Sequence, residues 1–349
     1  MAKLTAPLYI CGAGAVTAAG LNSSQTIAAI RASLSAYDEY VVGEPFGAVQ
    51  TVSRITAHHQ LRRTYGEWLV NMAARALEET LGSGDVDARS TCILLAPPEG
   101  FREHPAFADI AQRDFLDAVI GATGHEFHPS SRAIDGGAAA GLGLLSRVSQ
   151  VLAQGDVKQV LLGGVDSLVN DKDIARLEAA GRLRSNANSD GMIPGEAAAF
   201  VRIAGLANRL PRAPLAQIHG VGMSSESDSV LSERFSQGHA MLAALREALD
   251  GARPTEPDIV FVVRNSNGER YDGWEQMIAQ PRFYRTRREM LPTAYPAMTV
   301  GDVGSASGAL ALMVAADSLD KGYAPGPVAM VEVASEGGFR AAALVSRVG

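Results

Sequence analysis

The chain has 349 residues, enough for two units at roughly 150 residues per domain. Apolar residues make up 47% and charged residues 20%, which are ordinary values for a globular protein. The net charge of −7 argues against nucleic acid as a partner, because there is no basic excess to displace phosphate counterions. The only two cysteines, Cys11 and Cys92, exclude a disulfide framework and favour a location in the reducing cytoplasm.

The N-terminal segment resembles a signal peptide, but only superficially. Lys3 precedes an apolar run that Pro7 and two glycines interrupt. We therefore expect a buried first strand near residues 7–13, followed by a helix that is capped at Asn22. No apolar stretch approaches the ~20 residues that cross a bilayer, so the sequence predicts no membrane span.

Neither a cofactor nor a metal is expected. Gly12 and Gly14 follow the first strand, but Thr17 stands where a dinucleotide fingerprint has its third glycine, so a tight turn at the strand end is the better interpretation. The histidine pairs 58–59 and 125/128 lack the HExxH spacing of a zinc site, and we expect them on surface loops.

The chain repeats itself. Residues 135–155 align without a gap with residues 302–322, and seven of the 21 positions are identical. Further pairs of similar segments follow in the same order, and the last of them is 197–201 with 341–345. We infer a duplication of βαβαβαββ halves, with an N-terminal half over residues 1–207 and a C-terminal half over residues 208–349.

Four segments resemble landmarks of the β-ketoacyl-acyl-carrier-protein synthases: residues 12–20, 155–164, 186–197 and 301–308. This resemblance covers nearly the whole chain. It implies an α/β protein with a thiolase-like fold, in which the two halves form a layered α-β-α-β-α core. The Gly- and Ala-rich helices 137–154 and 303–321 would then be a buried pair between two sheets.

The resemblance also implies that the catalytic residues are missing. In that family a cysteine at the start of the first buried helix attacks the acyl thioester, and two histidines and a lysine lie close to it. The cysteine position aligns with Ala138, the histidines with Asn267 and Asp302, and the lysine with Ala297. A methyl group cannot attack a thioester, so we expect a catalytically inactive pseudoenzyme.

Five residues are candidates for a pocket. The two phenylalanine gates of the family align with Ser185 and Glu336, and its glycine-rich C-terminal motif brings Phe339 to the same region. Asp135 and Glu196 come from motifs that surround the family's active site.

Carboxylates offer an alternative chemistry. Asp135, Asp190, Glu196 and Asp302 would act as acid and base if they converged, which would make the chain an acyl-thioester enzyme of a non-standard kind. We favour a structural role in which Asp135 and Asp302 cap the two buried helices.

Protein binding is therefore the expected function. Because both gates are lost, we favour an adaptor or chaperone, for example for an effector or spike component of a bacterial secretion system. The alternative is a chain-length-factor-like partner of an active ketosynthase in polyketide or fatty-acid biosynthesis. The expected partners are a second copy, a ketosynthase-like protein, an effector or an acyl-carrier protein. The resemblance implies a dimer in which the strand over 158–165 pairs across the two-fold axis, and residues 160–162 agree with such an edge, since they carry no charge or proline.

Overall fold

The computed structural model describes residues 4, 6–43, 48–56, 64–82, 87–101, 112–205, 213–232 and 234–349. His58, His59 and the expected boundary between residues 207 and 208 lie outside the described residues. None of the described helices is long and apolar enough to cross a membrane.

Ten strands of the described chain form one mixed sheet, in the order β10-β9-β11-β12-β8-β1-β7-β6-β4-β5. The N-terminal half contributes β1 (Leu8–Thr17), β4 (Thr91–Ala96), β5 (Arg132–Ala133), β6 (Gln159–Ser167) and β7 (Glu196–Ala204). The C-terminal half contributes β8 (Ala216–Ser225), β9 (Phe261–Arg264), β10 (Thr293–Ala294), β11 (Val328–Ala334) and β12 (Phe339–Ser346). Each strand has its counterpart at the same distance from the centre of the sheet, so the predicted duplication is confirmed.

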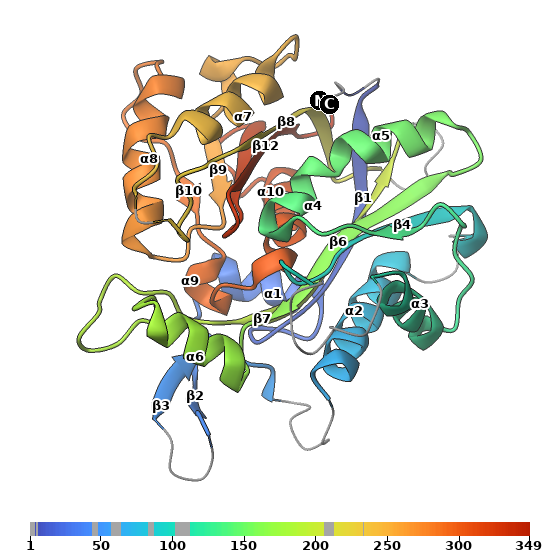
Figure 1. Ribbon diagram of the computed structural model, residues 1–349. Helices are drawn as coiled ribbons and strands as arrows, with labels where there is room; N and C mark the ends of the chain where they lie inside the picture. Colours follow the sequence, from blue (N-terminus) through green and yellow to red (C-terminus); the bar gives the residue numbers. More distant parts are fainter. Residues whose placement is uncertain are drawn as a thin grey trace.

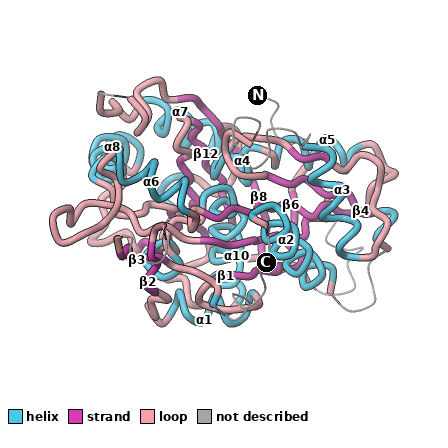
Figure 2. The backbone as a smooth tube through the Cα atoms, turned by 60° about the horizontal axis from the view of Figure 1, so that its bottom comes forward, coloured by secondary structure: helices cyan, strands magenta, loops and turns pink. Residues whose placement is uncertain are grey.

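The helices form three layers around the two halves of the sheet (Figure 1). One outer layer holds α2 (Tyr65–Leu81) and α3 (Gln112–Thr123), and the other holds α7 (His239–Leu249) and α8 (Arg270–Phe283). The inner layer holds α4 (Gly137–Gly143), α5 (Leu145–Ala153) and α10 (Ser307–Asp320). Figure 2 shows the same arrangement from another side. The two halves of the sheet are continuous, because residues 8–10 of β1 pair with residues 216–218 of β8.

The remaining elements lie around this core. They are α1 (Ser23–Arg31), α6 (Asp171–Ala179), α9 (Ala297–Val300) and the separate hairpin of β2 (Asp38–Val41) and β3 (Val49–Val52). The predicted cap of α1 is confirmed, since the Asn22 side chain accepts a hydrogen bond of 2.8 Å from the Gln25 N–H.

Strand β6 lies in the interior of the sheet, between β4 and β7. Val160 and Leu162 face the inner helices, whereas Leu161 and Val165 face α2 and α3. The expectation that residues 158–165 form an open edge is therefore wrong. A strand that is covered on both faces shows the same uncharged apolar pattern as an unprotected edge. In the described chain the outermost strand of this half is β5.

The expected turn at Gly12 and Gly14 is also wrong, because both glycines lie inside β1. A Cβ atom on Gly14 would come within 2.3 Å of the Ala76 carbonyl oxygen in α2. Its counterpart Gly222 in β8 would come within 2.0 Å of the Ala244 carbonyl oxygen in α7. These glycines let one outer helix in each half rest directly on the sheet.

The predicted buried helix pair is confirmed. A Cβ atom on Gly141 of α4 would lie 2.9 Å from the Gly308 Cα atom of α10, so the two backbones touch where the helices cross. These glycines occupy equivalent positions in the two repeats. The first helix differs from the prediction in one respect, because Leu144 interrupts it and separates α4 from α5.

We predict that Gly141→Val destabilises the protein by about 1–3 kcal/mol, because the new side chain has no space at the helix crossing. Chemical denaturation would measure this change in the free energy of unfolding. Gly121→Ala is the control, since Gly121 lies on the exposed face of α3 with nothing within 4 Å of its added Cβ atom. It should leave stability unchanged or raise it by up to about 1 kcal/mol. Equal effects of the two substitutions would contradict the close contact.

Candidate functional site

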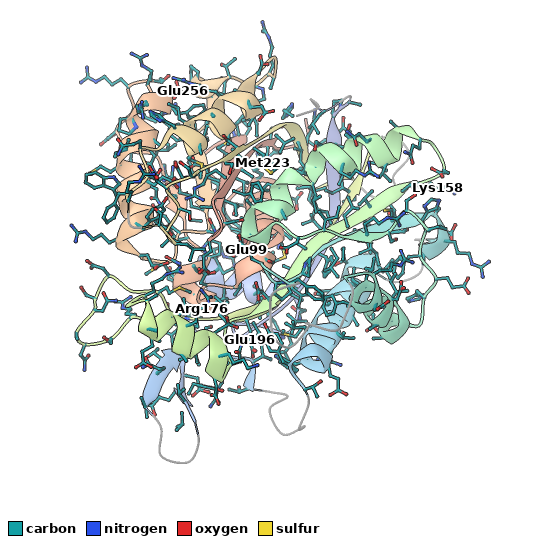
Figure 3. All side chains as sticks on the ribbon, in the orientation of Figure 1. Glu99, Lys158, Arg176, Glu196, Met223 and Glu256 are labelled. Atoms are coloured by element: carbon teal, nitrogen blue, oxygen red, sulfur yellow. The ribbon has the colours of Figure 1, made fainter. Side chains whose placement is uncertain are left out.

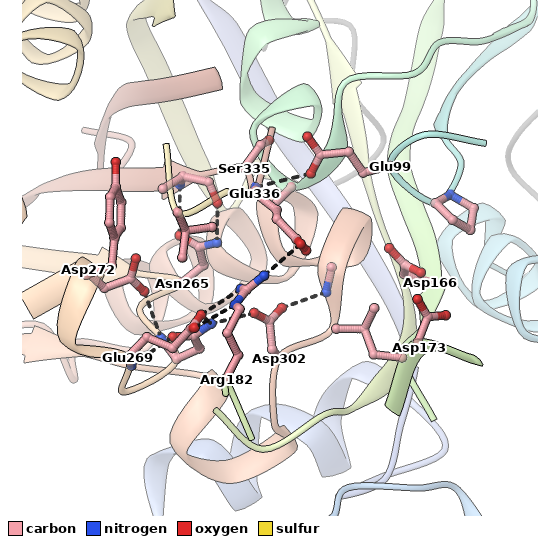
Figure 4. A pocket seen from close by; sticks show the side chains of 18 of the residues that line it. Glu99, Asp166, Asp173, Arg182, Asn265, Glu269, Asp272, Asp302, Ser335 and Glu336 are labelled. Atoms are coloured by element: carbon pink, nitrogen blue, oxygen red, sulfur yellow. Dashed lines mark hydrogen bonds and ion pairs between the residues drawn. The ribbon is translucent and has the colours of Figure 1, made fainter. Parts of the chain in front are cut away.

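A cavity of about 80 Å³ lies at the carboxyl ends of four strands, two from each half. Glu99 follows β4, Asp166 lies at the end of β6, Asn265 follows β9 and Ser335 follows β11, and all four residues line the cavity. Crevices at the carboxyl ends of strands are the usual ligand sites of open α/β sheets. The cavity is therefore the candidate functional site, and Figure 4 shows its lining.

Three of the four positions that the sequence resemblance aligns with catalytic residues meet at this cavity. Ala138, Asn267 and Asp302 all line it. The Asn267 side-chain amide donates a hydrogen bond of 2.8 Å to Asp302 Oδ2, so the two histidine positions are directly linked. Ala297 does not line the cavity, because it forms the first residue of α9 and α9 packs elsewhere.

Neither of the two proposed helix caps is found. Asp302 Oδ1 accepts a hydrogen bond of 2.9 Å from the Gly304 N–H, but the N-cap residue of this 3₁₀ turn is Val303 and that of α10 is Ala306, so the first cap is wrong. The N-cap residue of α4 is Gly136 rather than Asp135, so the second cap is wrong. A hydroxyl group replaces the carboxylate there, since the Ala139 N–H donates to Ser335 Oγ at 2.8 Å.

Of the five residues expected in a pocket, only Glu336 lines this cavity. Asp135 is exposed before α4. Ser185 is exposed in a tight turn that its backbone closes with Asn188. Phe339 begins β12 and is 40% exposed.

Glu196 is buried in a network of its own, away from the cavity. Its carboxylate accepts hydrogen bonds from the Ile55 N–H (2.7 Å), Trp68 Nε1 (2.9 Å) and Ser167 Oγ (2.9 Å). It thus joins three segments of the N-terminal half, and Figure 3 shows it well separated from Glu99. Asp190 is exposed. The alternative of four converging carboxylates is therefore wrong.

Arg182 is the centre of the ionic network in the cavity, and the sequence analysis missed it. Its guanidinium group donates to both carboxylate oxygens of Glu269, at 2.7 and 2.8 Å, and to Glu336 Oε1 at 2.6 Å. Arg176 also pairs with Glu336. The side chains of Arg182 and Glu269 are only 10% and 8% exposed, so these charges are largely shielded from water.

The cavity is acidic, and several of its carboxyl groups are shifted toward the neutral form. Burial raises the pKa of Glu99 and of Asp272 to about 7 and that of Asp166 to about 8. Burial also raises the pKa of Asp302. Seven carboxyl groups face three arginines: Glu99, Asp166, Asp173, Glu269, Asp272, Asp302 and Glu336 against Arg176, Arg182 and Arg340.

No metal site emerges from the described part of the chain, in which no group of three or more His, Cys, Asp or Glu side chains is arranged to hold an ion. His125 and His128 lie on the loop after α3, and the His128 ring contacts Asp156. Cys11 and Cys92 belong to β1 and β4 and do not line the cavity. Burial raises the pKa of both thiols to about 11, so neither supplies a thiolate at neutral pH.

Comparison with known proteins gives matches to solved structures only. No protein-family profile matches the sequence, and no curated protein is significantly similar to it. A chain from a type II polyketide synthase acyl-carrier protein in complex with its ketosynthase bound to the hexaketide matches with a TM-score of 0.84. The identity is 15%, over 98% of this chain and 100% of that chain.

Two further matches are complexes of ketosynthases with chain length factors. The ishigamide ketosynthase/chain length factor has a TM-score of 0.81 and 16% identity, over 99% of this chain and 100% of that one. A ketosynthase in complex with its chain length factor from Xenorhabdus doucetiae has a TM-score of 0.77 and 14% identity, over 98% of each chain. The chain therefore has the thiolase-like fold of these proteins, as the resemblance predicted.

We predict that Arg182→Met destabilises the protein by about 3 kcal/mol or more, because Glu269 and Glu336 would be left as shielded charges without this partner. Arg184→Met is the matched control. Arg184 is exposed two residues further along the same segment, so its replacement should change stability by less than about 0.5 kcal/mol. Urea denaturation measures both effects, and similar values for the two variants would contradict the central role of Arg182.

We predict that stability falls as the pH rises from about 4 to 7, and that Asp272 contributes to this fall. Its pKa of about 7 in the folded protein exceeds the value of about 3.9 in the unfolded chain, so the folded state binds the proton more tightly. This contribution is fully present below pH 4 and is lost as the pH passes 7. Asp272→Asn should therefore unfold more easily than wild type at pH 4, and the difference should shrink by about 1 kcal/mol or more by pH 8. A difference that is constant with pH would contradict the raised pKa.

Proposed function

We propose that this chain is a non-condensing partner subunit of a ketosynthase, comparable in role to a chain length factor. The observation that carries the proposal is that one cavity is lined by Ala138, Asn267 and Asp302, which the sequence resemblance aligns with the cysteine and the two histidines of a ketosynthase. The hydrogen bond between Asn267 and Asp302 ties these two side chains together. Together they provide neither a nucleophile for a thioester nor an imidazole pair for decarboxylation.

The size of the cavity supports a role that does not require an acyl substrate of its own. Its volume of about 80 Å³ is far below the roughly 300–1,000 Å³ of small-molecule sites. The purified chain should accordingly release no carbon dioxide from a malonyl-carrier protein.

The comparisons favour this role over an adaptor for a secretion system. Two of the matched structures are complexes of a ketosynthase with a chain length factor, and another contains an acyl-carrier protein with its ketosynthase. Nothing among these matches points to an effector or a spike component. Cys11 and Cys92 are both free thiols, which supports the proposed cytoplasmic location.

The edge strand β5 is the proposed contact with the ketosynthase. The Ile134 N–H donates to the Leu95 carbonyl oxygen of β4 at 2.8 Å. Because successive N–H groups of a strand point in opposite directions, the Ala133 N–H points away from β4, toward the outer side of the sheet. In the described chain no strand pairs with that side. A strand of the partner would continue the sheet there.

The experiment that tests the proposal is purification of the tagged chain from its native host, followed by native mass spectrometry. We expect a one-to-one complex with a ketosynthase. Ala133→Pro should abolish the complex, because proline removes the outward N–H group but is tolerated at a sheet edge. A monomer at micromolar concentration, or a stable complex with a secretion component only, would contradict the proposal.

Thr293→Pro is the matched control on the opposite edge of the sheet. The Val262 N–H donates to the Pro292 carbonyl oxygen at 3.0 Å, so the Thr293 N–H also points away from its neighbouring strand. This variant should keep the complex. Loss of the complex in both variants would show that proline acts through general destabilisation and would leave β5 without a specific role.

A further inference from the structure

The Glu99 carboxylate is bound by two consecutive backbone N–H groups. Oε1 accepts a hydrogen bond of 2.8 Å from the Gly337 N–H, and Oε2 accepts one of 3.2 Å from the Glu336 N–H. Adjacent backbone N–H groups that converge on one point form a typical anion-binding concavity. Among the described residues, no arginine, lysine or histidine forms an ion pair with Glu99. The backbone itself therefore holds this carboxylate.

Two glycines make room for the carboxylate. A Cβ atom on Gly137 would come within 2.2 Å of Glu99 Oε2, and one on Gly337 would come within 2.4 Å of Oε1. Any other residue at either position would displace the carboxylate or be displaced by it. The space around the two N–H groups is thus shaped to fit a carboxylate group.

The loop that carries Glu99 is anchored on both sides. It leaves β4 after Ala96, and two residues beyond Glu99 the Phe101 ring is fully buried. The Phe101 and Phe115 ring centroids are 5.4 Å apart, so the loop is fixed to α3. The loop that places Glu99 in the cavity is therefore held by β4 on one side and by α3 on the other.

The turn that provides the N–H groups is anchored as well. The Ser335 N–H donates to the Phe339 carbonyl oxygen at 2.8 Å, and Arg340 Nη1 donates to the Ser335 carbonyl oxygen at 2.9 Å. The Glu336 side chain is held by Arg176 and Arg182, as described above. The two N–H groups consequently keep their direction whether or not a carboxylate is bound.

The surroundings of Glu99 do not favour its negative charge. Its pKa is raised to about 7, mainly by burial and further by the nearby carboxylates of Glu336 and Asp135, although the backbone N–H groups act in the opposite direction. An uncharged side chain in the same place would avoid the free-energy cost of burying a charge. The position of Glu99 is thus explained by the N–H groups that it fills.

We propose that the N–H groups of Glu336 and Gly337 form a binding site for a small carboxylate, and that Glu99 is the tethered ligand of this site. Glu99 occupies the site in the native chain and keeps other anions out of the cavity. A free carboxylate binds there only when this side chain is removed. The inference goes beyond the proposed function, because pairing with a ketosynthase through β5 does not require the site.

The test compares wild type, Glu99→Ala and Glu99→Gln, with sodium acetate as the probe. Backbone amide signals of Glu336 and Gly337 are followed by two-dimensional NMR. In Glu99→Ala we expect both signals to move saturably at millimolar acetate, whereas sodium chloride of equal ionic strength leaves them in place. Acetate should also raise the melting temperature of this variant by a few degrees. Wild type and Glu99→Gln should show neither effect, since their side chains fill the site.

Two results would overturn the proposal. In the first, Glu99→Ala is folded but its Glu336 and Gly337 amide signals do not move when acetate is added. In the second, the wild-type signals move with acetate as much as those of the variant. If Glu99→Ala does not fold, wild type and Glu99→Gln are compared between pH 5 and 9. The Glu336 and Gly337 amide signals should then titrate near pH 7 in wild type only. Glu336 and Asp135, the charged groups that face Glu99, are present in both proteins, so a titration common to both would reject Glu99 as the ligand.

Discussion

The contact between Gly141 and Gly308 is the constraint on which the rest of the structure depends. Because neither residue has a side chain, α4 and α10 cross with their backbones in contact, at the centre of the duplicated fold. This crossing brings the start of α4, with Ala138, close to the turn before α10, with Asp302. The two sheet halves then close around the pair, and the carboxyl ends of their inner strands meet at one cavity. Larger side chains at this crossing would move α4 and α10 apart and so separate Ala138 from Asp302.

The fold could be predicted from the sequence to a large extent, because its strongest constraints are local and repeated. Glycines at equivalent positions of the two repeats mark close approaches of backbone, and these positions survive divergence at the surface. The place of each strand in the sheet could not be predicted equally well. Residues 158–165 are uncharged because helices cover both faces of β6, and that pattern does not distinguish a central strand from an open edge.

The candidate site could likewise be predicted from the sequence only in part. Ala138 could be located by counting along an ungapped helix, and Asn267 and Asp302 stand beside glycines that fix their backbone positions. Ser185 was misplaced because it belongs to an exposed turn, whose path depends on tertiary contacts, and Phe339 because it lies at the exposed start of β12. Arg182 pairs with Glu269 and Glu336, which lie 87 and 154 residues further along the sequence, so no local sequence pattern predicts this network. Glu99 had a usable signal, since it follows the buried strand β4 at its carboxyl end.

The burial of the two native cysteines has a practical consequence for work on this chain. With a pKa of about 11, each thiol is ionised in roughly one molecule in ten thousand at pH 7, and the thiolate is the form that attacks maleimides and disulfide reagents. A single cysteine introduced at an exposed position such as Ser185 would therefore react far ahead of Cys11 and Cys92. A fluorophore or spin label can be attached at one chosen point without first removing the native cysteines, which makes the assembly of this chain with other proteins directly observable.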